Sequence, residues 1–156
     1  MSSIVGQWFT PFVTVIGGVI IFVVGQAVLK LLIEPVQHLK AAVGNVANTL
    51  LRQQAKITNG LEDADLSAKM FDHAAELVSK AEVVVFYKSA KSIFGLPSKA
   101  HILEAARELN AIGNEARDKR PSGAHSHSPP NGLAAVRNHE SIKRIAGLLR
   151  IKADYK

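Results

Sequence analysis

The chain has 156 residues, a net charge of +6 and no cysteine, and 47% of its residues are hydrophobic. Without cysteine it can form neither a disulfide framework nor a thiolate metal site. A chain of this length can bury one modest core.

The N-terminal segment carries no charged side chain before Lys30. A helix from Trp8 to Leu29 would be about 33 Å long, enough to cross a hydrocarbon core of about 30 Å. A cleaved signal peptide is the alternative, but such peptides have a basic start, a shorter apolar core and a small-residue cleavage site. The segment has none of these features, so we predict a retained transmembrane helix over residues 1–33.

The charges that flank this helix predict its orientation. No Lys or Arg precedes it, whereas Lys30 and Lys40 follow it closely. The positive-inside rule then places the N-terminus outside and the rest of the chain in the cytoplasm. The basic segments can be drawn to an anionic inner leaflet or, alternatively, to an anionic ligand such as a nucleotide.

Small and polar residues recur along one face of the predicted membrane helix, and the apolar spacing continues past Pro35 with a shift of one residue. Small-residue faces are typical of helix contacts in lipid, although glycine is common in membrane helices anyway. We therefore expect a parallel homo-oligomer around a narrow path. Its expected lining is Gln7, Thr14, Gly18, Ile21, Gly25 and, at the inner end, Glu34. Glu34 is equally well explained by an ion pair with Lys30.

The rest of the chain has helical periodicity, which predicts an all-α fold. We expect a juxtamembrane amphipathic helix over residues 34–58, with Pro35 marking its joint with the membrane helix, and a cytoplasmic helical bundle over residues 59–156. Asn59 and Gly60 predict a turn between the two parts. The Pro-, Gly-, Ser- and His-rich stretch 120–132 predicts a flexible loop.

Within the cytoplasmic domain, one helix is expected from Leu66 to about Lys88, followed by a short helical piece that ends at Gly95. A further helix is expected to begin after Ser98, its N-cap, and the last helix to run from about Leu133 to Lys152. The run from Val83 to Tyr87 could also be a strand, but it has no partner strand, so helix is preferred. The positions expected to face inward are Leu66, Met70, Ala74, Leu77, Ala81, Val84, Ile102, Ala105, Leu109, Ile112, Ala116, Val136, Ile142, Ile145 and Leu149.

No enzyme signature is present: there is no phosphate-binding loop, no nucleophile elbow and no zinc-protease motif. We therefore expect neither catalysis nor a cofactor. His125 and His127 have a spacing that could touch a metal, but no acidic or thiolate partner accompanies them. No metal site is predicted.

The best candidate for ligand contact is the corner from Phe86 to Lys99. It combines aromatic rings for base stacking, lysines, and a helix N-terminus with free N–H groups for phosphate. Its predicted ligand is a nucleotide or a single-stranded oligonucleotide. The alternative is a plain helical corner with solvated lysines. The predicted ligand-binding residues are Tyr87, Lys88, Lys91, Ser98 and Lys99, joined by Arg137, Lys143 and Arg144 of the last helix.

Four sequence elements carry a resemblance: Phe86-Tyr87, Gly95-Leu96-Pro97-Ser98, Ile102-Leu103-Glu104-Ala105 and Gly113-Asn114. They resemble recurrent motifs of a group of small bacterial membrane proteins. The architecture is also similar to that of the channel effector of the Hailong anti-phage defence system. This resemblance implies a tetrameric ion channel in the bacterial inner membrane, held closed by an oligonucleotide from a partner nucleotidyltransferase. It implies no particular binding residues. The alternative function is a membrane-anchored adaptor that binds a protein partner.

Overall fold

The computed structural model describes residues 2–117 and 132–153, with side chains from residue 11 onward. These residues form helices and contain no strand, so the predicted all-α fold is confirmed for this part of the chain. Residues 120–131 of the predicted loop lie outside the described residues, as do His125 and His127.

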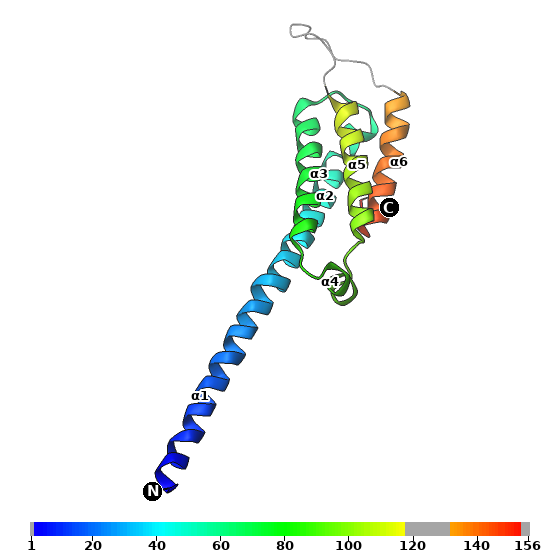
Figure 1. The fold of residues 1–156 in the computed structure, drawn as a ribbon. Helices are drawn as coiled ribbons and strands as arrows, with labels where there is room; N and C mark the ends of the chain where they lie inside the picture. Colours follow the sequence, from blue (N-terminus) through cyan, green and yellow to red (C-terminus); the bar gives the residue numbers. More distant parts are fainter. Residues whose placement is uncertain (1, 118–131, 154–156) are drawn as a thin grey trace.

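The N-terminal half is one long helical rod (Figure 1). α1 (Ser2–Val28) passes through a π-helical turn, η1 (Leu29–Ile33), into α2 (Glu34–Thr58). The apolar part of this rod is long and apolar enough to cross a membrane, by length and composition, and its most apolar window has no buried residue.

The rod does not break at Pro35, where a joint was expected. Proline cannot donate the helical N–H bond and its ring crowds the carbonyl four residues earlier. Directly before it, the Glu34 N–H donates to the Leu29 carbonyl, five residues back, in the wider π turn. We infer that the π turn accommodates Pro35 without interrupting the helical backbone.

α2 forms a four-helix bundle with α3 (Ala64–Val83), α5 (Lys99–Ala116) and α6 (Gly132–Leu149). Neighbouring helices run antiparallel around the bundle, in the order α2, α3, α5, α6 (Figure 1). The short α4 (Tyr87–Phe94) connects α3 to α5 at the end of the bundle from which α1 extends. Four amphipathic helices can thereby bury one shared core.

The apolar face of α2 is used within its own chain. Leu39, Val46 and Leu50 are fully buried in the core, and α2 packs against α3 and α6. The continuation of the membrane-helix spacing into α2 therefore reflects the fold of one chain and gives no evidence for parallel copies.

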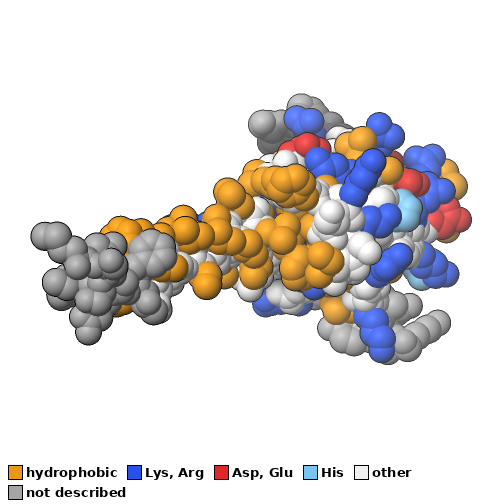
Figure 2. Space-filling model, turned by 60° about the horizontal axis from the view of Figure 1, so that its bottom comes forward, with side chains coloured by type: hydrophobic (Ala, Val, Ile, Leu, Met, Phe, Trp, Pro, Cys, Tyr) orange, Lys and Arg blue, Asp and Glu red, His pale blue; other side chains and the backbone are white. Residues whose placement is uncertain are grey.

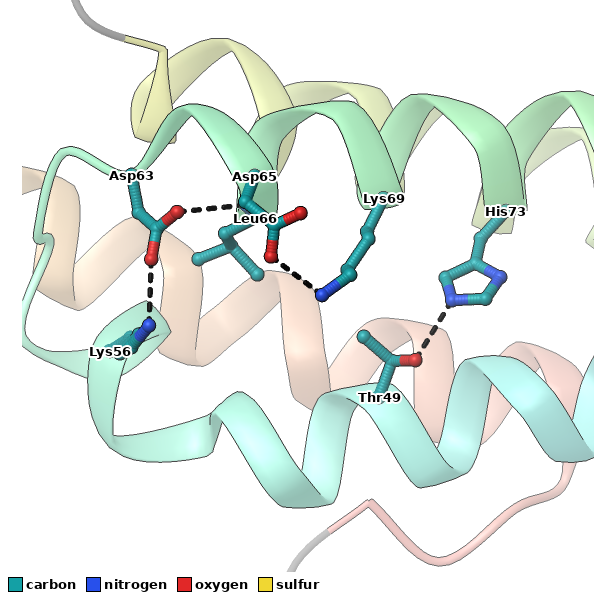
Figure 3. A network of polar contacts seen from close by, with 7 residues as sticks. All are labelled: Thr49, Lys56, Asp63, Asp65, Leu66, Lys69 and His73. Carbon is teal, nitrogen blue, oxygen red and sulfur yellow. Dashed lines mark hydrogen bonds and ion pairs between the residues drawn. The ribbon is translucent and has the colours of Figure 1, made fainter.

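The turn between α2 and α3 is fixed by a backbone cap and by the side chain of Asp63, whose contacts Figure 3 shows. Gly60 adopts a left-handed conformation with φ of 62°, and the Leu61 N–H donates to the Lys56 carbonyl, as in a Schellman C-cap. Asp63 then caps α3 by accepting from the Leu66 N–H at 3.0 Å and from Lys56 Nζ at 2.7 Å. The predicted turn at Asn59 and Gly60 is confirmed.

The second helix ends earlier than predicted, at Val83 instead of Lys88. Val84 is extended, with φ of −68° and ψ of 109°, and Phe86 is left-handed, with φ of 52°. Both conformations stop a right-handed helix, and no strand forms here either. Val84 is nevertheless buried as predicted, because it turns into the core just after the helix ends.

The last helix also differs from the prediction. It ends at Leu149, where Arg150 adopts a left-handed φ of 56° and the Ile151 N–H donates to the Ala146 carbonyl. Val136 is 61% exposed instead of inward. A polar residue, Asn138, takes the buried position and donates from Nδ2 to the Ile57 carbonyl of α2 at 2.9 Å. Apolar spacing alone could not identify this buried amide.

Candidate functional site

From residue 11 onward, the predicted pore-lining positions of α1 are exposed in a single chain. Thr14, Gly18, Ile21 and Gly25 are all exposed, and Ile21 is 75% exposed. A Cβ atom added at Gly18 or Gly25 would meet nothing within 4 Å. The side chain of Gln7 lies outside the described residues. In a single chain these residues line no path, so a path requires further copies.

Glu34 does not share this face. At about 100° of rotation per residue, Glu34 lies about two and a half turns beyond Gly25 along the helix. The π turn between them changes the angle between the two side chains by the rotation of about one residue. Its carboxylate is exposed at the start of α2, between a quarter and half of a turn away from the face of Gly25. The geometry therefore gives no support to a carboxylate ring that continues the small-residue face.

The corner around α4 brings five predicted ligand residues together. Tyr87, Lys88, Lys91, Ser98 and Lys99 line one hollow of about 650 Å³, which we call the α4 hollow. Phe86 and Ser89 complete its described lining, which contains no carboxylate. Neither was among the predicted ligand residues, although both lie within the predicted corner. Phe86 is exposed because α3 ends at Val83, whereas the sequence predicted that this helix continues to about Lys88.

Three of these five residues already have partners within the chain. The Tyr87 hydroxyl donates to the Pro97 carbonyl at 2.7 Å, and burial raises its pKa. Lys99 pairs with Glu82 at 2.9 Å and lies 5.4 Å from the Tyr87 ring centroid. Ser98 caps α5 by accepting from the His101 N–H, as predicted. These contacts hold the corner in shape, which is a structural role.

Lys88 and Lys91 differ from these three. Both are exposed, and neither has an ion pair or a hydrogen bond from its ammonium group to any described residue. They are the cations of the α4 hollow that remain available to an external anion.

The three basic residues of the last helix do not join the α4 hollow. Arg137, Lys143 and Arg144 line a separate hollow of about 560 Å³ between α5 and α6. Arg144 donates to Glu108 at 2.8 Å and Arg137 pairs with Glu115 at 3.3 Å. Partial burial acts to raise the pKa of Glu108, but the hydrogen bonds from Arg144 and Ser141 outweigh it and lower the pKa.

Carboxylates therefore balance the cations of the α5–α6 hollow. An incoming phosphate would have to displace these carboxylates or be repelled by them. A nucleotide site that combines both basic clusters has no support in this geometry.

The described residues contain no group of three His, Asp or Glu side chains placed to hold a metal ion. The polar clusters on α3, α5 and α6 consist of ion pairs and helix caps. Two hydroxyl groups contact possible bases in this part of the chain. Thr49 Oγ1 lies 2.8 Å from His73 Nε2 (Figure 3), with Glu76 4.0 Å from the other ring nitrogen, and the Ser141 hydroxyl donates to Glu108 at 2.7 Å.

Comparison with known proteins finds no matching family model, no matching characterised protein and no matching solved structure. The motif resemblance to small bacterial membrane proteins and the architectural resemblance to the Hailong channel effector thus both remain expectations from the sequence.

Proposed function

We propose that this protein is the subunit of a homo-oligomeric membrane channel. In this proposal α1 spans the membrane and lines the path, and the bundle of α2, α3, α5 and α6 lies on the cytoplasmic side. One observation carries the proposal: from residue 11 onward the described side chains of α1 are almost all exposed, and Thr14, Gly18 and Gly25 lie on one face of the helix. An anchor in lipid needs no such face, whereas close helix packing does.

The continuous rod supports control of α1 by the bundle. α1, η1 and α2 form one helix without a flexible linker, so a rotation of the bundle is transmitted directly to the membrane segment. π turns within helices occur frequently at functional positions. The turn at Leu29–Ile33 lies where the apolar segment ends, at the junction through which such a rotation would pass.

Two neighbouring glycines allow a matched test. Gly18 lies on the small-residue face and Gly17 lies about 100° away, and a Cβ atom at either would meet nothing within 4 Å. In liposomes that contain the full-length protein, Gly18→Leu should reduce ion flux at least tenfold, whereas Gly17→Leu should leave it nearly unchanged. Equal flux in the two variants would exclude this face as the path lining.

A membrane-anchored adaptor is the second candidate. It is favoured by the burial of the α2 face within one chain, which removes one reason to expect further copies. The adaptor predicts no flux from the wild-type protein at any protein-to-lipid ratio. The same liposome measurement therefore separates the two functions.

A further inference from the structure

The α4 corner lies at the membrane end of the molecule if α1 spans a bilayer. In Figure 1, α4 sits below the ends of α3 and α5, beside the point where the rod leaves the bundle. The contact between Lys40 and Phe94 agrees, with Nζ 6.0 Å from the ring centroid. Lys40 follows the π turn by about 10 Å along the helix axis. The interfacial layer on each side of a bilayer is about 5–8 Å thick, which puts Lys40 just beyond the headgroups and α4, below the ends of α3 and α5, within reach of them.

This corner exposes large apolar side chains. Phe86 is 78% exposed and Ile93 is 69% exposed, and Val83 and Val85 are exposed beside them. Figure 2, which brings the α1 end forward, shows hydrophobic side chains continuing from α1 onto the near end of the bundle. Lys and Arg side chains lie farther out on the same face. Contiguous exposed apolar surface in a folded domain marks an interaction site.

The backbone at Phe86 is strained as well as exposed. A left-handed φ of 52° is unfavourable for a bulky residue and costs about 1–2 kcal/mol. The Phe86 ring gains little packing in return, because most of its surface lies in solvent. Strain of this kind is found at functional positions.

The charges of the α4 hollow complement an anionic surface. Lys88 and Lys91 are exposed and unpaired among the described residues, and the described lining contains no carboxylate. Each lysine near an anionic leaflet contributes about 1 kcal/mol of attraction. The α5–α6 hollow, at a distance from α1, is charge-balanced instead. Of the two hollows, the one without carboxylates in its described lining is thus the one nearer to the membrane end.

We infer that α4 and Phe86 form an interfacial element that rests on the anionic membrane surface and sets the bundle against the bilayer. Phe86 and Ile93 contact the acyl boundary, and Lys88 and Lys91 contact lipid phosphates, as in interfacial amphipathic segments. This inference depends on the membrane location that the proposed channel also requires. It does not depend on conduction.

Tryptophan fluorescence tests the inference. The chain has a single tryptophan, so Trp8→Phe gives a background in which one new tryptophan reports alone. The full-length variants are placed in phosphatidylcholine vesicles with and without phosphatidylglycerol, with brominated acyl chains as quencher. Phe86→Trp reports on α4. Phe22→Trp reports on α1, and Leu133→Trp, 73% exposed at the opposite end of the bundle, is the solvent control.

We expect Phe86→Trp emission in anionic vesicles to shift to shorter wavelength by several nanometres and to be quenched by brominated lipid. Leu133→Trp should show neither effect. Lys88→Gln with Lys91→Gln should abolish the quenching at Phe86→Trp. The matched pair Lys69→Gln with Lys143→Gln, which removes equal charge away from α4, should preserve it. Circular dichroism of each variant verifies that the helices are intact.

Three outcomes overturn the inference. If Phe22→Trp is quenched and Phe86→Trp is not, the interfacial element is absent although the membrane span stands. If Phe22→Trp is also unquenched, the membrane location fails, and the proposed channel fails with it. If Phe86→Trp responds to a single-stranded oligonucleotide in zwitterionic vesicles but not to brominated lipid, the α4 hollow binds a free phosphate ligand instead of lipid.

Discussion

At the scale of single residues, Asp63 links the pH to the stability of the bundle. The hydrogen bond from Lys56 and that from the Leu66 N–H lower the pKa of Asp63 below its usual value. A carboxyl with a lowered pKa in the folded state stabilises the fold above its unfolded pKa of about 3.9, and this contribution is lost as the pH falls through the folded value. The loss therefore begins below about pH 4.

We expect Asp63→Asn to remain folded with its helix cap, because asparagine is also a good N-cap. Its free energy of unfolding should depend less on pH below about pH 4 than that of the wild type. Asp63→Ala should lose about 1 kcal/mol at pH 7 because the cap is gone. Denaturant titration of the full-length protein in detergent at several pH values measures both effects. Identical pH profiles for wild type and Asp63→Asn would contradict the assignment.

Asn138 is a second residue whose side chain ties two helices together. Its amide is buried at 3% exposure and bonds the Ile57 carbonyl, so truncation removes a hydrogen bond and leaves space in the interface. We expect Asn138→Ala to lower the free energy of unfolding by about 1–3 kcal/mol. His139→Ala, next to it but exposed, should change stability by less than about 0.5 kcal/mol. Equal effects in thermal denaturation would exclude a role for the buried amide.

At the scale of elements, α4 combines a confirmed C-terminus with an unexpected start. Its end at Gly95, with φ of 67°, follows the sequence prediction, because glycine tolerates the left-handed conformation. Its start at Tyr87, after the left-handed N-cap residue Phe86, did not follow from the sequence, since no propensity rule places a phenylalanine at positive φ. Tertiary packing of Val84 and Tyr87 on the core decides where α3 stops.

The strain at Phe86 can be measured by a glycine substitution. Phe86→Gly removes an exposed ring and relieves the left-handed backbone, so stability should stay unchanged or rise by about 1 kcal/mol. Val85→Gly alters a neighbouring exposed residue without positive φ and should lower stability by about 1 kcal/mol, because glycine adds only unfolded-state entropy there. Chemical denaturation in detergent compares the two. A larger loss for Phe86→Gly would contradict the strain.

Helix positions and most of the core were predictable from periodicity. The inward positions of α3 and α5 are buried as expected, from Leu66 to Ala81 and from Ile102 to Ala116. Positions that depend on polar contacts were not predictable, such as the buried Asn138 and the paired Arg144. Basic residues look alike in sequence, and only the fold shows that Glu108 neutralises Arg144 while Lys88 and Lys91 stay unpaired.

At the scale of the whole molecule, a folded bundle is joined to an exposed apolar rod. The bundle buries most of its own apolar positions, whereas the described side chains of α1, from residue 11 onward, are almost all exposed in a single chain (Figure 1). Lipid can cover its Val, Ile and Phe side chains, but packing in lipid favours contacts between small residues. The face of Thr14, Gly18 and Gly25 is therefore where copies should meet, and the number of copies determines whether a path remains.

The absence of native cysteine makes this contact directly testable. Ile21 lies on the small-residue face, and Val23 lies about 200° around the helix from Ile21, so it points to the opposite side. Both side chains are more than half exposed, at 75% and 57%. In vesicles under mild oxidation, Ile21→Cys should form disulfide-linked dimers in high yield, whereas Val23→Cys should remain mostly monomeric. If the copies pack around a central axis, reagents that crosslink two lysines should yield crosslinked species up to the tetramer. Equal disulfide yields at the two positions would show random collision, and the shared axis on which the proposed channel depends would be excluded.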